Sequence, residues 1–329
     1  AGGVTALQIL PGSANLVGGR GVTLKNMPAT SVQAMKFPDA PWGVKMACGE
    51  NPKRVYGSRG GPATRMGNMA GYRAAFIDAQ EYLKKQSAAD SKVGAAKSGK
   101  RSRKSAEDAS SAGDSGKRDL RLETLAGVLS GDIKVHIHCY RADEMNNMLD
   151  LAKEFNFKIA AFHHGVEAYK IADRLAEEGV CGALWADWWG FKMEALDGIQ
   201  DNIALVDRPA NSCAIVHSDS DEGIQRLNQE AAKVMAHAEL VGIDIPPERA
   251  IRWLTENAAK SLGILEQTGT LQTGKMADVV LWNGNPFSVY AQAEQVWIDG
   301  ARMFDRHDRA RQPVSDFMLG QDSPQGGAR

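Results

Sequence analysis

Long apolar segments and a strong net charge are both missing from this chain of 329 residues. No apolar run approaches the ~20 residues that a helix needs to cross a bilayer, so we expect no membrane-spanning segment. The formal net charge is −1 at pH 7. A chain so close to neutral lacks the basic surface that binds nucleic acid or anionic membranes, and we expect neither partner for the molecule as a whole.

Cysteine is scarce, and no CxxC pair occurs. The four cysteines are far apart and lie in or beside apolar, strand-like runs; they are Cys48, Cys139, Cys181 and Cys213. We predict that all four are buried free thiols that behave as small apolar side chains. For Cys48 and Cys139, which fall near the mouth of the predicted sheet, we favour packing over a ligand role.

A leader peptide is not evident either. The first residues, AGGVTALQILPG, have neither the charged start nor the cleavage-site pattern of a signal peptide. They are typical of the interior of a longer protein, so we expect the chain to be part of one. Its compartment, cytoplasm or periplasm, stays open.

Two short apolar runs do stand out, residues 133–137 and 158–162, and histidines follow both. Such runs are typical of parallel strands, which helices cover on both faces. A histidine at the carboxyl end of such a strand lies where ligands and metals bind. A single histidine there is more often a hydrogen-bonded structural residue, but two on successive units make His138 and His164 candidate metal ligands.

A third apolar run, residues 213–216, leads into His-Ser-Asp and then into an amphipathic helix. Asp219 could hold a metal and accept a proton, because a carboxylate serves both as an oxygen ligand and as a general base. Alternatively, Asp219 or Ser220 caps the helix that begins near Asp221. Both roles are compatible with one loop.

Residues 44–48 form a further predicted strand, with Lys45 inside it and Glu50 just beyond it. Glu50 could bridge two metal ions, and Lys45 could do so after carbamylation. Alternatively, Glu50 caps the next turn and Lys45 pairs with an acidic neighbour. We rank Glu50 ahead of Lys45 as a ligand.

The stretch of residues 87–118 has almost no large apolar side chain. Its basic cluster, residues 100–104, could bind nucleic acid, but the acidic residues mixed into the stretch favour a solvated insertion. We predict a disordered or weakly ordered surface loop.

An aromatic stretch, residues 185–191, follows the strand predicted at residues 180–185. Its three tryptophans either line a substrate pocket or cover the sheet as a hydrophobic plug, and both interpretations stay open. Asp187 could orient a substrate amine. After residue 263 the pattern changes to antiparallel β structure, and the tail from residue 306 is polar and expected to fray.

The run TENAAKSLGI (residues 255–264), followed by GTLQTGKMADVVLWNGNP and VWIDG, resembles the C-terminal part of the amidohydrolase superfamily. The runs GENPKRVYG, IHCYRADE, HHGVEAYKIAD and HSDSDEGIQRLNQEAAK belong to the same resemblance. It covers nearly the whole chain apart from residues 87–118. Within the superfamily, the chain is most similar to bacterial imidazolonepropionase-like, metal-dependent hydrolases.

The resemblance implies an α/β fold: a TIM-like (β/α)8 barrel, lacking its first strand in this chain, with a small C-terminal β-sandwich portion. Residues 1–265 would form the barrel with its insertion at 87–118, residues 266–305 the sandwich portion, and residues 306–329 the tail. The family's His-x-His pair on the first strand is absent. His136-Ile-His138 has the same letters but stands on the fifth strand, so the chain is either a fragment or a barrel that has lost half of its metal site.

By this resemblance, the metal ligands are His138 on strand five, His164 on strand six and Asp219 on strand eight, with Glu50 or Lys45 as the bridge. The ligands imply one or two divalent ions, with zinc expected. Further candidates, for contacts with a small-molecule substrate, are Arg141, Tyr169, Trp188 and His217.

The function that follows is hydrolysis of a C–N bond, in a cyclic amide, an amidine, an acylated amino acid or a dipeptide, by metal-activated water. Asp219 would be the catalytic residue that takes the proton of the water and returns it to the leaving nitrogen. The alternative is a catalytically silent truncated barrel that binds a small molecule or a partner as a scaffold. Assembly into a homo-oligomer is left open.

Overall fold

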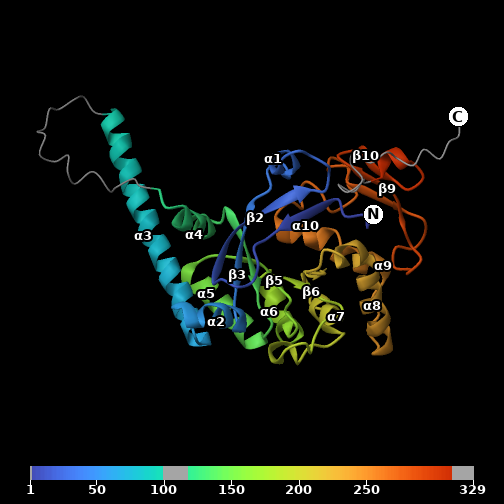
Figure 1. The fold of residues 1–329 in the computed structure, drawn as a ribbon, viewed down its shortest axis with the longest axis horizontal. Coiled ribbons are helices and arrows are strands. Elements are labelled where there is room, and N and C mark those ends of the chain that lie inside the picture. The colour runs from blue at the N-terminus through green and yellow to red at the C-terminus, as the bar shows by residue number, and fades with distance from the viewer. Residues whose placement is uncertain (1, 99–117, 313–329) are drawn as a thin grey trace, which may run out of the picture.

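The computed structural model describes residues 2–98 and 118–312. A curled sheet of seven strands, in the order β1-β2-β3-β4-β5-β6-β7, lies at the centre of a mixed α/β fold (Figure 1). Its strands are β1 (Ala6–Ile9), β2 (Val17–Lys25), β3 (Trp42–Ala47), β4 (Ile133–His138), β5 (Ile159–His163), β6 (Cys181–Leu184) and β7 (Ala214–Val216). The pairs β1–β2 and β2–β3 are antiparallel, whereas β3 to β7 pair in parallel. The parallel strands coincide with the apolar runs that predicted them.

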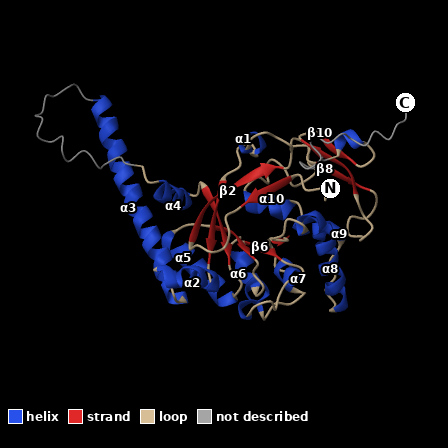
Figure 2. Ribbon diagram, viewed as in Figure 1, coloured by secondary structure: helices blue, strands red, loops and turns tan. Residues whose placement is uncertain are grey.

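Helices link these strands and cover the sheet (Figure 2). The helices are α1 (Val32–Met35), α2 (Glu50–Tyr56), α3 (Arg65–Ser98), α4 (Leu120–Ser130), α5 (Ala142–Phe155), α6 (Ala172–Glu177), α7 (Asn202–Asp207), α8 (Leu227–Leu240), α9 (Pro247–Ala250) and α10 (Glu256–Leu262). Short 3-10 helices precede α6 and α8 and follow α9. The chain therefore alternates strand and helix from β3 to β7, as a parallel sheet requires.

The parallel strands have two chemically different faces, because successive side chains point to opposite sides of a strand. One face is apolar and buried under the helices; Val44, Val135, Ile137, Phe162 and Val216 belong to its core. The opposite face has Lys45 in register with His136, and His138 in register with His163. We call the side chains of Lys45, His136, His138, His163 and His217 the histidine face.

Helix α5 illustrates why these segments become helices. Met145, Met148, Leu149 and Phe155 recur at helical spacing and are all buried against the sheet. Asn156 ends the helix in the left-handed conformation, with φ of 56°, and its backbone N–H donates to carbonyl groups of the last turn. The burial of α5 fixes the loop after β4, from which the site is built.

The prediction of a loop at residues 87–118 is wrong for the first part of that stretch, because α3 continues to Ser98. Alanine and lysine have high intrinsic helix propensity, and AADSKVGAAK is rich in both, so the helix continues without an apolar stripe. Its C-terminal half extends away from the body of the molecule (Figure 1). The basic cluster at residues 100–104 lies outside the described residues.

The four cysteines form two disulfides, Cys48–Cys139 and Cys181–Cys213, so the prediction of free thiols is wrong. Strand register explains the pairing: Ala47 lies opposite His138 and Gly182 opposite Ala214, which puts the neighbouring cysteines side by side. The Cα–Cα distances are 5.2 Å and 4.5 Å, within the range of a disulfide. All four residues are buried, as predicted.

A second sheet contains β8 (Val279–Trp282), β9 (Ala293–Ile298) and β10 (Ala301–Asp305) in the order β10-β9-β8. Both strand pairs are antiparallel, as the pattern after residue 263 predicts. Its small core consists of Ala293, Val296, Ile298 and Phe304. Among the described residues, no helix has both the length and the apolar character to cross a membrane.

Candidate functional site at the carboxyl ends of the parallel strands

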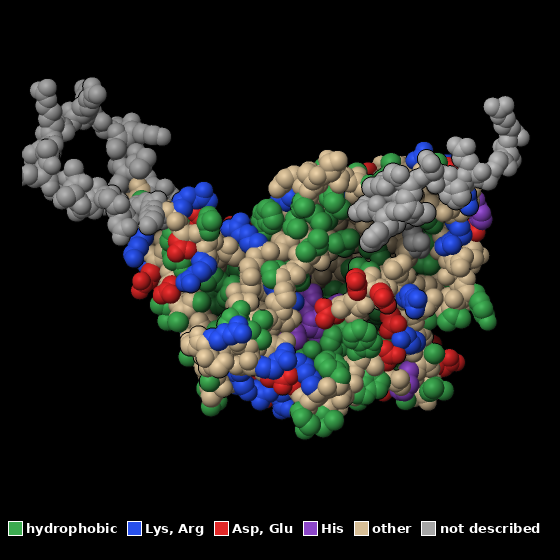
Figure 3. Space-filling model, viewed as in Figure 1, with side chains coloured by type: hydrophobic (Ala, Val, Ile, Leu, Met, Phe, Trp, Pro, Cys, Tyr) green, Lys and Arg blue, Asp and Glu red, His purple; other side chains and the backbone are tan. Residues whose placement is uncertain are grey.

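The carboxyl ends of β4, β5 and β7 bring the predicted ligands to one edge of the sheet. His138 is the last residue of β4, His164 follows β5, and Asp219 follows β7. His164 and Asp219 both have left-handed backbones, with φ of 61° and 51°. This conformation is uncommon outside glycine and turns the chain sharply where each strand ends. In Figure 3, histidine side chains lie at the bottom of a hollow in the surface.

The three predicted ligands lie close together. The rings of His138 and His164 have centroids 5.0 Å apart, and Nε2 of His164 lies 3.7 Å from Oδ2 of Asp219. Both rings are 2% exposed, whereas the Asp219 side chain is 55% exposed. Two buried imidazoles and one solvent-accessible carboxylate therefore share one site.

His217 contacts a ring nitrogen of His164 rather than standing free for a substrate. Its Nε2 lies 2.7 Å from Nδ1 of His164. Trp185 stacks on the same ring, with centroids 4.7 Å apart. Together these contacts fix the His164 ring with Nε2 toward Asp219.

Burial keeps the imidazoles of this site uncharged. Burial is the larger cause and the nearby charge of Lys45 the smaller, and together they lower the pKa of His138 and of His217 to about 3. Burial, together with His217 and His138, also moves the pKa of His164 well below its usual value. Partial burial raises the pKa of Asp219, and Lys45 opposes this shift. Neutral imidazoles have a lone pair for a proton or a cation.

Lys45 and Glu50, the alternatives for the bridging position, differ in their surroundings. Lys45 is buried on the histidine face, and burial lowers the pKa of its amine against the attraction of Asp219. Glu50 begins α2 and forms an ion pair with Lys192, with 3.0 Å between Oε1 and Nζ. The lysine, not the glutamate, therefore shares the electrostatic environment of the imidazoles.

The remaining candidates lie at different distances from the site. Arg141 pairs with Asp143 at 3.0 Å, and the Tyr169 hydroxyl donates to the Asp197 carbonyl at 3.2 Å. Trp188 is 48% exposed, with its ring 5.6 Å from that of Trp185. Of these three, only Trp188 extends the aromatic cluster of the site.

Sequence reasoning missed three members of the site. The Tyr140 ring lies 4.5 Å from the His138 ring, and Asn51 Nδ2 lies 3.1 Å from His138 Nε2. Lys192 in turn contacts Asn51. Tyr140 could have been found from its place two residues after His138, but no local pattern points to Lys192.

The donor set has the chemistry of a zinc site, since imidazole nitrogen and carboxylate oxygen are zinc ligands. The buried Nδ1 of His138 and Nε2 of His136 have no hydrogen-bond partner. Within residues 2–98 and 118–312, however, no three or more His, Cys, Asp or Glu side chains are arranged to hold a metal ion. The donors suit zinc, but one nitrogen of His138 contacts Asn51 and one nitrogen of His164 contacts His217.

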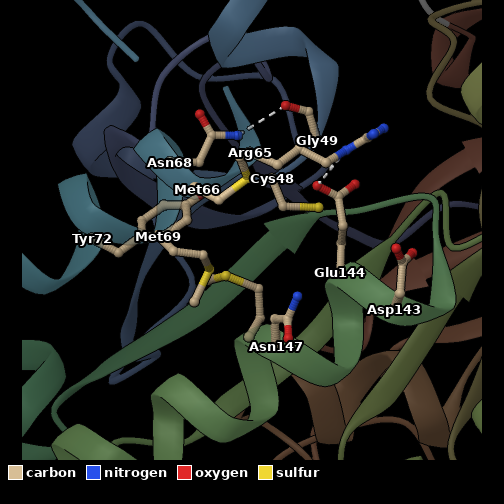
Figure 4. A pocket seen from close by; sticks show the side chains of 11 residues that line it. Cys48, Gly49, Arg65, Met66, Asn68, Met69, Tyr72, Asp143, Glu144 and Asn147 are labelled. Carbon is tan, nitrogen blue, oxygen red and sulfur yellow. Dashed lines mark hydrogen bonds and ion pairs between the residues drawn. The ribbon is translucent and has the colours of Figure 1, made fainter. Parts of the chain in front are cut away.

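A cavity of about 130 Å³ lies elsewhere, between the end of β3 and helices α3 and α5 (Figure 4). Arg65 lines it, with Nε 3.0 Å from Glu144 Oε1 and Nη2 3.2 Å from Glu194 Oε1. Burial raises the pKa of Glu144 to about 7 against the opposing charge of Arg65. A Cβ at Gly49, which has φ of 77°, would collide with Glu194. None of the predicted site residues lines this cavity, so we treat it as structural.

Comparison with known proteins connects this site to a family. The crystal structure of an amidohydrolase from Thermotoga maritima MSB8 matches with a TM-score of 0.77 and 34% sequence identity. The match covers 93% of this chain and 73% of that chain. The chain belongs to the amidohydrolase family. A model of the amidohydrolase family also matches residues 168–304.

Curated relatives of this amidohydrolase-family chain are considerably longer. Amidohydrolase tasK of Hapsidospora irregularis is 33% identical over 318 residues, which are 92% of this chain and 31% of that protein. The imidazolonepropionase of Shewanella pealeana is 28% identical over 177 residues, 50% of this chain and 39% of that enzyme. The chain thus spans well under half the length of these relatives. The resemblance to imidazolonepropionase-like proteins is confirmed.

Proposed function

We propose that the chain contains the site of a hydrolase that cleaves a C–N bond in a small molecule, such as a cyclic amide, an amidine, an acylated amino acid or a dipeptide. The observation that supports this most is the meeting of His138, His164 and Asp219 at one edge of a parallel sheet. Relatives named amidohydrolase and imidazolonepropionase support the same reaction class.

In this proposal His138, His164 and Asp219 would hold one or two divalent ions, with zinc the best match to the donors. Such an ion would lower the pKa of a water molecule and would polarise the carbonyl group of the substrate. Asp219 accepts the proton of the attacking water and returns it to the leaving nitrogen. Its exposed carboxylate suits that task, because it faces the solvent from which water enters. His217 and Trp185 keep His164 in place meanwhile.

For the bridging position we prefer Lys45 to Glu50. The lowered pKa of Lys45 leaves more of its amine uncharged, and only an uncharged amine adds CO2 to form a carbamate. Glu50 is engaged by Lys192. The aromatic rings of Tyr140 and Trp188 are our candidates for contacts with the substrate, whereas Arg141 and Tyr169 pair with surface residues.

We also propose that the curled sheet is part of a TIM-like (β/α)8 barrel and that β8 to β10 are part of a β-sandwich. The parallel order of β3 to β7 and the similarity to the Thermotoga maritima structure support this architecture. It corresponds to a barrel portion at residues 1–265 and a sandwich portion at residues 266–305.

The test compares the full chain with Asp219→Asn and His164→Ala, supplied with zinc and assayed against N-acyl amino acids, dipeptides and cyclic amides. We expect Asp219→Asn to lose about 10²–10⁴-fold in turnover, the usual contribution of a general base, while it keeps most of its zinc. His164→Ala should lose zinc and turnover together. Equal losses of zinc and turnover in Asp219→Asn would show that Asp219 is only a ligand.

A scaffold without turnover is the second candidate. It is favoured by the absence, among the described side chains, of an assembled group of three metal donors. Less than one tightly bound zinc per chain, together with no hydrolysis of the whole substrate panel, would support the scaffold over the hydrolase.

A further inference from the structure

His138 has a hydrogen-bond partner on a helix that belongs to a different part of the sequence. Asn51 is the second residue of α2, and its Nδ2 lies 3.1 Å from Nε2 of His138. An imidazole nitrogen either donates or accepts, depending on where the ring proton sits. This contact alone therefore leaves the proton of His138 unassigned.

Lys192 resolves the orientation of the Asn51 amide. Its Nζ donates to Oδ1 of Asn51 at 3.2 Å. An ammonium group has donors and no acceptor, so the end of the amide that faces it must be the oxygen, and the NH2 group must face His138. Nε2 of His138 is then the acceptor. A neutral ring in this arrangement would have its proton on Nδ1, which is buried and has no hydrogen-bond partner.

Lys192 itself is held from several sides. Its Nζ lies 3.0 Å from Oε1 of Glu50 and 4.3 Å from the centroid of the Tyr140 ring. Two residues further on, Glu194 accepts from the backbone N–H of Glu50 at 3.0 Å and from Arg65 at 3.2 Å. These contacts tie the loop between β6 and α7 to the start of α2, so the position of the ammonium is set by the fold rather than by solvent.

We propose that Lys192 and Asn51 are positioning residues that fix His138 as a neutral imidazole with its proton on Nδ1. Lys192 orients the amide of Asn51, and the NH2 group of that amide donates a hydrogen bond to Nε2 of His138. This proposal rests on the proposed function and deepens it, because it concerns when His138 can bind a cation. Held in this way, His138 has its N–H on Nδ1, and the lone pair of its Nε2 faces the Asn51 amide. Either nitrogen becomes a lone-pair ligand for a cation only after the Asn51 amide turns or withdraws. The loop that contains Lys192 therefore controls when His138 can join a metal site.

The experiment records two-bond ¹H–¹⁵N correlations of the imidazoles in the full chain, ¹⁵N-labelled and metal-free, at pH 7. His138→Gln assigns the His138 signals by their loss. In the wild-type chain we expect a protonated Nδ1 and an unprotonated Nε2. Asn51→Asp replaces the NH2 group by an acceptor, so it should move a proton onto Nε2.

Lys192→Met removes the cation that orients the amide, so His138 should show a mixture of both tautomers. Lys192→Arg retains the donors and should restore the wild-type pattern. Lys170→Met removes another lysine, one paired with Asp197 at the surface, and should leave the His138 signals unchanged.

A wild-type spectrum with the proton on Nε2, or a Lys192→Met spectrum identical to the wild type, would overturn the proposal. Neither spectrum needs a metal or a substrate. An active hydrolase with the proton on Nε2 contradicts this inference alone, while the expected tautomer in a chain without hydrolysis contradicts the proposed function alone.

Discussion

Uncharged imidazoles define the chemistry of the histidine face and of His164, which lies beside it. His136 and His163 share a contact of 3.0 Å, and His164 and His217 share one of 2.7 Å. Each ring lies too deep to be protonated near neutral pH, because burial penalises its charged form. At the scale of single residues, the cost of burying these rings must therefore appear in the pH dependence of stability.

His136 gives the clearest case, since it has no assigned part in the proposed reaction. Burial, with smaller contributions from Lys45 and Lys134, lowers its pKa to about 3 from a usual value of 6.5. Between these values the unfolded chain binds a proton that the folded chain does not. The free energy of unfolding should thus fall as the pH drops from 6.5 toward 3, by up to ~1.4 kcal/mol per pH unit for this ring.

Urea unfolding of the wild type and of His136→Gln across that pH range measures this contribution. The variant should lose stability less steeply with falling pH. His307→Gln, which changes a mostly exposed ring, is the control substitution. If the free energy of unfolding of His136→Gln falls with pH as steeply as that of the wild type, His136 is protonated in the folded chain and the prediction is wrong.

At the scale of elements, strand register determines which cysteines form disulfides. Each apolar run shows from sequence alone that a strand exists, and the positions of β3 to β7 follow from those runs. Which residue of one strand lies opposite which residue of the next depends on contacts between segments as distant as Cys48 and Cys139, separated by 91 residues. No local pattern encodes that register, so the disulfides were missed.

The two disulfides should stabilise the chain unequally. In the loop-entropy model, closing the separation of 91 residues contributes about 5 kcal/mol, and closing the separation of 32 residues between Cys181 and Cys213 about 4 kcal/mol. Cys48→Ala with Cys139→Ala should therefore lower the denaturation midpoint more than Cys181→Ala with Cys213→Ala.

Thiol titration of the unfolded, unreduced chain provides the control for this prediction. We expect no reactive thiol before reduction and four after it, one for each cysteine of the sequence. Four thiols before reduction would contradict both disulfides and remove the basis for the difference in stability.

Helix α3 shows a second limit of element prediction. The apolar positions that identify a packed helix end where its last buried turns end. The helix nevertheless continues to Ser98 because alanine-rich sequence forms helix without a partner surface. The absence of an apolar stripe therefore does not by itself exclude a helix.

At the scale of the whole molecule, the meeting of the three proposed ligands can be predicted from the sequence more easily than their surroundings. His138, His164 and Asp219 lie close together because each ends or follows an apolar strand of the same sheet, and parallel strands bring their carboxyl ends to one edge. From the sequence, Glu50 ranks ahead of Lys45 because Glu50 follows the strand that contains Lys45. The ion pair between Glu50 and Lys192, however, depends on a loop 142 residues away, from position 50 to position 192. The sequence could not place that loop.

The chain covers 73% of the Thermotoga maritima amidohydrolase and 31% of its relative from Hapsidospora irregularis, so the central claim must be tested on the chain itself. The most direct measurement is the rate of C–N bond hydrolysis by the full chain against the amount of zinc bound, before and after chelation. We predict that the rate rises in proportion to bound zinc, disappears on chelation and returns with added zinc. Zinc bound in full without hydrolysis of any substrate in the panel would contradict the account.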